Sequence, residues 1–152
     1  MSYAHDVHSE TVRSRPDSGS ASALALAVSR LSRRLRQERD TALTATQLSA
    51  LGSLLRHGPV TVGTLAAYER IQPPSMTRTV NGLVEAGMVR REPHATDGRQ
   101  VVVHLSEQGG AVLEAERRRR DAWLAQQLRL LAPEQRDLLR RAAPLLEELA
   151  RS

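Results

Sequence analysis

The residues best suited to binding chemistry lie in one short polar run, residues 73–81. Apolar residues at helical spacing predict a helix over residues 72–86, with an inner face of Met76, Val80, Leu83 and Val84. The outer face would carry small or hydrogen-bonding side chains, whereas an ordinary solvated face would normally interleave acids. The small and hydrogen-bonding side chains of the outer face could bind base edges and phosphates in the major groove of DNA. The predicted major-groove residues are Pro73, Pro74, Ser75, Thr77, Arg78 and Asn81.

A basic hairpin is predicted directly after this helix. Gly87 ends the helix, and two β-prone runs follow, 88–92 and 99–105, the second alternating as a half-buried strand does. Asp97 and the glycine after it favour a turn at the tip, which leaves Arg99 projecting. An arginine on such a wing can enter the narrow minor groove. The alternative is a surface pair with Asp97, which could itself hold the guanidinium in position. The predicted wing contacts are Arg90, Arg91, His94, Asp97 and Arg99.

Two short helices are predicted before this run. Thr44 and Gln47 have the spacing of a capping box, in which each side chain binds the other residue's backbone N–H. The helix that they begin should end near His57, and Thr61 should cap a shorter one. Three short helices and a hairpin make a winged helix-turn-helix, predicted over residues 44–106. As helix caps, Thr44 and Thr61 would lie near the DNA backbone.

The two ends of the chain predict a dimer. Residues 1–20 lack apolar periodicity and are expected to form a flexible arm. Helices are expected over about 22–39 and 107–131, with a last one opened by Pro133. Their leucines exceed what one small domain can cover. Residues 21–40 and 107–152 therefore predict a helical dimerisation region.

Two features of the C-terminal helices lead to separate predictions. The run Arg117–Arg120 lies among acids and is expected to form a solvated, salt-bridged face, with a phosphate contact as the alternative. Pro144 falls inside the last helix, where it should remove one hydrogen bond and bend the helix.

Composition narrows the class of function. The net charge of +5 and the isoelectric point near 11.0 favour an anionic partner. Aromatics make up 2% of the chain, too few for the stacking platform of a single-strand binder. The absence of cysteine excludes a disulfide, and the absence of a long apolar run predicts a cytoplasmic protein without a membrane partner. We expect no enzyme, metal site or cofactor, because no nucleophile–base pair, phosphate loop or metal-ligand cluster is present.

Together these motifs resemble the MarR family of winged helix-turn-helix transcriptional regulators. In that family the recognition helix ends in Leu-x-x-x-Gly, the wing carries Asp-x-Arg, and the next strand ends in Leu-Thr/Ser-x-x-Gly. Two positions depart from the pattern. Gln72 replaces the usual serine cap and is a poorer N-cap. Asn81-Gly82 replace a frequent acid, and the glycine weakens the helix by about 1 kcal/mol relative to alanine. The matching residues are Leu83 and Gly87, Asp97 and Arg99, and Leu105, Ser106 and Gly109.

The resemblance implies a mainly α (α+β) fold, with a single MarR-like domain over residues 21–152. Its first and last helices would intertwine into an obligate homodimer. Two recognition helices related by a two-fold axis would read a pseudo-palindromic operator, with half-sites about 10 bp apart.

The resemblance also implies a repressor that blocks polymerase, and a small-molecule effector bound between the dimer helices and the DNA-binding lobe. His57, Tyr68 and Trp123 are candidates for that pocket, with a packed core role as the alternative. The alternative function is a winged helix that contacts another protein and not DNA. It predicts acids or apolar residues on the recognition face, and the sequence shows neither.

Overall fold

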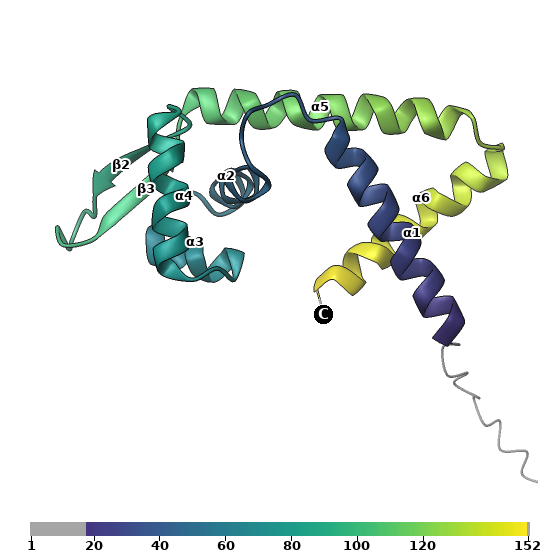
Figure 1. Cartoon of the computed structure of the whole chain (residues 1–152), viewed down its shortest axis with the longest axis horizontal. Coiled ribbons are helices and arrows are strands. Elements are labelled where there is room, and N and C mark those ends of the chain that lie inside the picture. Colours follow the sequence, from purple (N-terminus) through teal and green to yellow (C-terminus); the bar gives the residue numbers. More distant parts are fainter. Residues whose placement is uncertain (1–17, 152) are drawn as a thin grey trace, which may run out of the picture. The chain divides into compact units, whose positions relative to one another are not determined.

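The computed structural model describes residues 18–151, and its contacts divide the chain into two compact units, Met1–Arg34 and Leu35–Ser152 (Figure 1). The boundary falls inside the first helix, α1 (Ser18–Gln37). The predicted flexible arm, residues 1–20, lies outside the described residues except for its last three. Those three residues begin α1, which therefore starts at Ser18 and not at the expected residue 22.

Helix α1 is amphipathic, with an apolar stripe that is open to solvent. No residue of α1 is buried. A helix of this kind needs another surface to cover its stripe. The large exposed side chains of the stripe are Leu24, Val28 and Leu31, and Leu26 is exposed on the opposite side of the helix.

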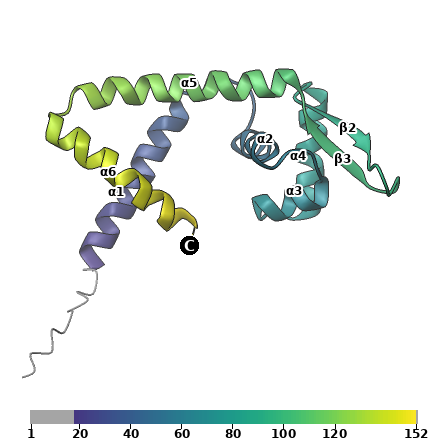
Figure 2. The ribbon, with the colours of Figure 1, turned by 180° about the vertical axis from the view of Figure 1, so that it is seen from behind.

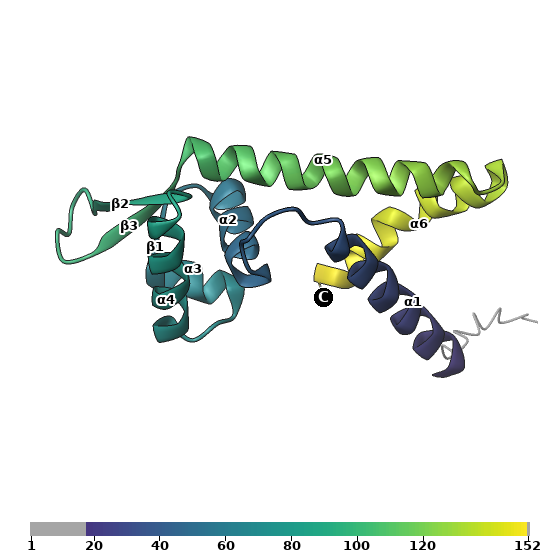
Figure 3. The same cartoon turned by 45° about the horizontal axis from the view of Figure 1, so that its top comes forward.

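The second unit contains the predicted winged helix-turn-helix, here called the lobe (residues 44–106), followed by two more helices. In all three views the hairpin projects away from the lobe's helices (Figure 1, Figure 2 and Figure 3). The elements in chain order are α2 (Ala45–His57), β1 (Val60–Thr61), α3 (Val62–Glu69), α4 (Pro73–Glu85), β2 (Val89–Pro93), β3 (Val101–Leu105), α5 (Glu107–Arg129) and α6 (Pro133–Arg151).

The sheet has one strand more than the predicted two-stranded wing. The strand order is β1-β3-β2, and β1 pairs antiparallel with β3 through Val60↔Val103 and Thr61↔Val102. A two-residue strand is too short to show a period-2 pattern, so nothing in the sequence marks it. In β3 the predicted alternation is only partly right. Val103 is buried, but Val101 is 42% exposed because it lies at the outer end of the hairpin, opposite Pro93.

The core of the lobe lies where α2, α3, α4 and β3 meet. As predicted, Met76, Val80 and Leu83 of α4 are fully buried. The prediction for Val84 is wrong, since its side chain is 36% exposed. At 3.6 residues per turn Val84 lies roughly 80° around the helix from Met76, at the edge of the apolar stripe. The buried partners outside α4 are Ala50, Leu51, Leu54, Leu65, Ala66, Met88, Val89 and Val103.

The predicted helix caps are present. The backbone N–H of Thr44 donates to Oε1 of Gln47 at 2.8 Å, and the backbone N–H of Gln47 donates to Oγ1 of Thr44 at 3.2 Å, which completes the capping box. Oγ1 of Thr61 accepts from the backbone N–H of Thr64 at 3.2 Å. Gln72 makes no side-chain cap bond, as expected of a poor N-cap.

The last two helices bury few of their own residues. Helix α5 ends at Arg129, two residues before the expected 131, and α6 continues through Pro144. Only Gly109 of α5 is buried, and α6 has no buried residue among those described. Within residues 18–151, no helix is both long and apolar enough to cross a membrane.

Helix α4, the hairpin and α5 meet at one tight junction. Gly87 leaves α4 with a φ of 74°, which glycine adopts readily. The hydroxyl of Ser106 donates to the Gly87 carbonyl at 2.7 Å and accepts from the Gly109 backbone N–H at 3.0 Å. The Ser106 backbone N–H donates to the Met88 carbonyl at 3.0 Å. A Cβ on Gly109 would lie 2.2 Å from that same carbonyl oxygen, so only glycine fits there.

Replacing Gly109 with alanine should destabilise the lobe by about 1–3 kcal/mol, because the backbone of Met88 must move to admit a methyl group. Gly110→Ala is the matched control, since a Cβ there would meet only the Leu105 side chain, at 4.0 Å. Alanine's better helix propensity should add up to about 1 kcal/mol at that site. Urea unfolding of the full chain measures both variants, and equal stabilities would contradict the close approach at Gly109.

Candidate nucleic-acid interface

The outer face of α4 carries the polar side chains that the sequence predicts for it. The helix begins with two prolines, which are tolerated there because a first-turn N–H has no partner within the helix. No acid occurs between residues 73 and 84. Of the predicted major-groove residues, Ser75 is half-buried, and the exposed ones are Pro73, Pro74, Thr77, Arg78 and Asn81.

Hydrogen bonds already engage part of this face. Oγ1 of Thr77 donates to the carbonyl of Pro73 at 3.0 Å. The Thr77 hydroxyl proton is therefore used within the helix, while its oxygen can still accept. Arg78 differs, because within residues 18–151 no hydrogen bond or ion pair engages its guanidinium. Its five N–H donors are open to a ligand.

Arg91 joins the wing to α4. Its guanidinium, on β2, donates a hydrogen bond to Oδ1 of Asn81 on α4. Both side chains are exposed. The sequence predicts each of them as a separate DNA contact, and the structure brings the two together as a pair.

Arg90 is bound within the wing. Its Nε donates to Oε1 of Glu92 at 2.8 Å, and Nε2 of His104 on β3 lies 3.2 Å from the other carboxylate oxygen. The hydrogen bond from Arg90 is the largest effect and lowers the pKa of the Glu92 carboxyl; desolvation opposes it, and the charges of His104 and Arg90 lower the pKa further. Arg90 therefore has a carboxylate partner of its own.

The tip of the wing is shaped by Asp97 and His94. Oδ1 of Asp97 accepts from the backbone N–H of Arg99 at 3.1 Å. Asp97 therefore binds the backbone of Arg99 and not its side chain. The side-chain pair considered from the sequence is absent, and no contact within residues 18–151 engages the Arg99 guanidinium. Nδ1 of His94 accepts from the backbone N–H groups of Thr96 and Asp97, each at 3.2 Å.

Two contacts that hold the lobe's helices together have no signal in the sequence. Glu69 of α3 accepts from the hydroxyls of Ser49, at 2.5 Å, and of Ser53, both on α2. Helices α2 and α4 approach closely where a Cβ on Gly82 would lie 2.9 Å from Nε2 of Gln47. The glycine in α4 therefore leaves room for the side chain that caps α2.

Of the three candidate effector-pocket residues, His57 and Tyr68 contact each other. The rings of His57 and Tyr68 stack with their centroids 4.2 Å apart and an interplanar angle of 24°. A packed core role is wrong for both, because His57 is exposed and Tyr68 is 47% exposed. Trp123 lies half-buried on α5. A shallow hollow elsewhere on the lobe includes none of the three and is lined by Thr61, Val62, Gly63, Gln100 and Val101.

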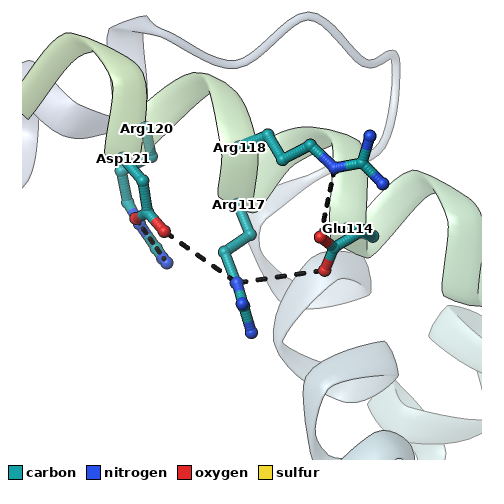
Figure 4. A network of polar contacts seen from close by, with 5 residues as sticks. All are labelled: Glu114, Arg117, Arg118, Arg120 and Asp121. Carbon is teal, nitrogen blue, oxygen red and sulfur yellow. Dashed lines mark hydrogen bonds and ion pairs between the residues drawn. The ribbon is translucent and has the colours of Figure 1, made fainter.

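The arginine run of α5 is salt-bridged, as predicted (Figure 4). Nε of Arg117 lies 3.9 Å from a carboxylate oxygen of Glu114 and 3.9 Å from one of Asp121. Arg118 pairs with Glu114 at 3.1 Å, and Arg120 pairs with Asp121 at 3.4 Å. These acids offset the local positive charge, which weakens the case for a phosphate contact there.

Arg119 has a different role from its neighbours in the run. Its guanidinium lies 3.0 Å from Glu116 on α5 and 3.0 Å from the Asp40 carboxylate. The backbone N–H of Asp40 also donates to Oε1 of Glu116 at 3.1 Å. The segment before α2 is thereby fastened to the middle of α5.

Comparison with known proteins finds similarity to transcriptional regulators, both in a family model and in individual sequences. The family model described as MarR family matches residues 43–100. An uncharacterized HTH-type transcriptional regulator of Mycobacterium leprae is 47% identical over 134 residues, which cover 88% of this chain and 94% of that protein.

Solved structures agree with these relatives. A transcriptional regulator from Pseudomonas aeruginosa has a TM-score of 0.78 and 34% identity, over 87% of this chain and 94% of the other. A MarR family protein from Bacillus stearothermophilus has a TM-score of 0.73 and 25% identity, over 87% and 93% of the two chains.

The Glu92 contacts predict a pH dependence of stability. The folded-state pKa of Glu92 lies below its ordinary value of 4.5, so its contribution is present above that pH and is lost on acidification through the folded value. The melting temperatures of wild type and Glu92→Gln should differ at neutral pH and converge below pH 4.5. Glu85→Gln, which removes an exposed acid without an ion pair among the described residues, is the control. A Glu92→Gln difference that persists unchanged in acid would contradict the assignment.

Proposed function

The chain belongs to the MarR family of winged helix-turn-helix transcriptional regulators, and we propose that it is a homodimeric repressor of a pseudo-palindromic operator. Its partner is double-stranded DNA. The observation that carries the proposal is the Arg78 guanidinium, which no other group within residues 18–151 engages and which extends from a helix face without acids. Arginine in a major groove binds O6 and N7 of guanine with two parallel hydrogen bonds.

The wing is proposed to follow the backbone and enter the minor groove. Arg90 and Arg91 are already hydrogen-bonded to Glu92 and Asn81, whereas the Arg99 guanidinium at the tip has no partner within the described residues. Arg99 is therefore the wing residue best placed to meet the negative potential of a narrow minor groove. His94 and Asp97 contribute by fixing the shape of the tip.

The homodimer is supported by apolar surface at both chain ends. Each of α1 and α6 presents leucines to solvent, and contiguous exposed apolar patches mark interaction sites. Two copies related by a two-fold axis would place two α4 helices in successive major grooves, with half-sites about 10 bp apart. The exposed leucines of α6 are Leu138, Leu139, Leu145, Leu146 and Leu149.

Repression would be steric, because a dimer bound over a promoter excludes polymerase. Release by a small-molecule effector would require a site whose occupation changes the separation of the two recognition helices. The stacked His57 and Tyr68 rings are the candidate with an observed contact, and Trp123 is a further candidate. An effector that binds equally well to both arrangements would shift nothing.

Footprinting on the DNA upstream of the protein's own gene tests this function. The full-length protein should protect two segments about one helical turn apart and prefer this DNA over random competitor at physiological salt. A protein with equal affinity for both DNAs is not a sequence-specific regulator. Sedimentation of the free protein checks the homodimer independently.

Replacing Arg78 with alanine should relax sequence discrimination at one base pair of each half-site and cost about 1–3 kcal/mol of specific binding. The loss should be larger on the operator than on random DNA, since only the base contact is specific. Titration of both DNAs by fluorescence anisotropy measures the difference. An equal loss on both would assign Arg78 to a phosphate.

Replacing Arg99 with alanine should weaken binding to operator and random DNA by similar factors. It should also reduce the slope of log K against log salt by about 0.9 for each phosphate that the variant no longer neutralises. Arg117→Ala is the matched control, because it removes the same charge from a residue that two acids already pair. Equal slopes for Arg99→Ala and Arg117→Ala would place Arg99 away from DNA.

A further inference from the structure

The pair formed by Arg91 and Asn81 fixes the orientation of the Asn81 amide. A guanidinium carries five N–H donors and no acceptor, so the end of the amide that faces Arg91 must be its oxygen. The hydrogen bond from Arg91 to Oδ1 of Asn81 satisfies this requirement. The other end of the amide, the NH2 group, is then turned away from β2. Both side chains are exposed, so the NH2 group remains open to a ligand.

We infer that Arg91 is a positioning residue that orients the Asn81 amide so that its NH2 group is the end presented to DNA, and that Asn81 thereby favours a base-pair edge rich in acceptors. The inference rests on the proposed DNA binding and specifies its chemistry. An asparagine grips adenine by accepting from N6 and donating to N7, which requires both ends of its amide to face the base. With Oδ1 directed to Arg91, adenine would meet the NH2 group with one acceptor, N7, beside its own N6 donor, which disfavours this two-bond contact. Guanine, with acceptors at O6 and N7, or thymine, with O4, suits an NH2 group.

The remaining groups of α4 extend the same pattern. Arg78 offers only donors, which suits guanine. Thr77 donates its proton to the Pro73 carbonyl, so its oxygen offers only an acceptor, beside a methyl group. Arg78 by its chemistry and Thr77 by its internal hydrogen bond thus each offer DNA a single polarity. The half-site should contain one guanine opposite Arg78 and a guanine or thymine, but not adenine, opposite Asn81.

The test is selection of bound sequences from an operator library in which each half-site position is randomised. Full-length wild type, Arg91→Ala, Arg91→Lys and Asn81→Asp are compared. Arg90→Ala is the matched control, because it removes an arginine one residue away on the same strand whose partner is Glu92. Thermal melting verifies that each variant is folded.

In wild type we expect adenine to be disfavoured about tenfold or more at the position opposite Asn81, in line with the discrimination of a good base contact. Arg91→Ala should remove that bias and admit adenine there, with the preference opposite Arg78 unchanged. Arg91→Lys keeps a donor for Oδ1 and should retain the wild-type profile. Asn81→Asp keeps the acceptor for Arg91 and loses the NH2 group, so it should lose the preference for guanine or thymine.

The inference is overturned if Arg91→Ala weakens binding by one factor at every position and leaves the base preferences unchanged. That result would make Arg91 a phosphate contact or a purely structural group. It is also overturned if Arg90→Ala changes the profile in the same way as Arg91→Ala. Failure of the proposed function looks different, because wild type itself would then select no sequence.

Discussion

The arrangement of the lobe depends on the contact between Gly109 and the carbonyl of Met88. That contact leaves no room for a side chain, so the first turn of α5 lies directly against the backbone that leaves α4. Ser106 reinforces it by binding both the Gly87 carbonyl and the Gly109 N–H. Three elements with different tasks, α4, the hairpin and α5, thus share one small region of backbone. Their relative positions follow from backbone geometry more than from side-chain packing, which tolerates more variation.

Internal hydrogen bonds and ion pairs determine which exposed arginines of the lobe remain open to a ligand. The lobe has several exposed arginines, and net charge alone does not distinguish them. Arg90 is held by a carboxylate and Arg91 by an amide oxygen, while Arg78 and Arg99 have no such partner in residues 18–151. An arginine that already has a carboxylate partner gains less from a phosphate, because it must exchange one anion for another. In the proposed DNA binding, the contacts that these side chains already make would therefore matter as much as their residue types.

The sequence predicts features that depend on neighbours along the chain. The capping box of Thr44 and Gln47, the burial of Met76, Val80 and Leu83 on α4, and the turn at Gly87 all follow from local spacing and are confirmed. Contacts between elements do not follow in this way. The Arg91–Asn81 pair, the binding of Glu69 to two serines and the strand β1 each join segments whose register only the folded chain defines. The prediction for Val84 fails for a related reason, since periodicity marks a stripe but not the extent to which a partner covers its edge.

The close approach of Gln47 to Gly82 also affects how far α4 could move in the proposed complex with DNA. The side chain that caps α2 lies against Gly82 in the last third of α4, so a displacement of α4 toward α2 would press on the cap of α2. Glu69 ties α3 to α2 in the same manner. The three helices are thus linked to one another by side-chain contacts within the lobe. In the proposed complex with two half-sites, an adjustment to a spacer of different length would therefore fall to the segments outside residues 44–106, which include α5.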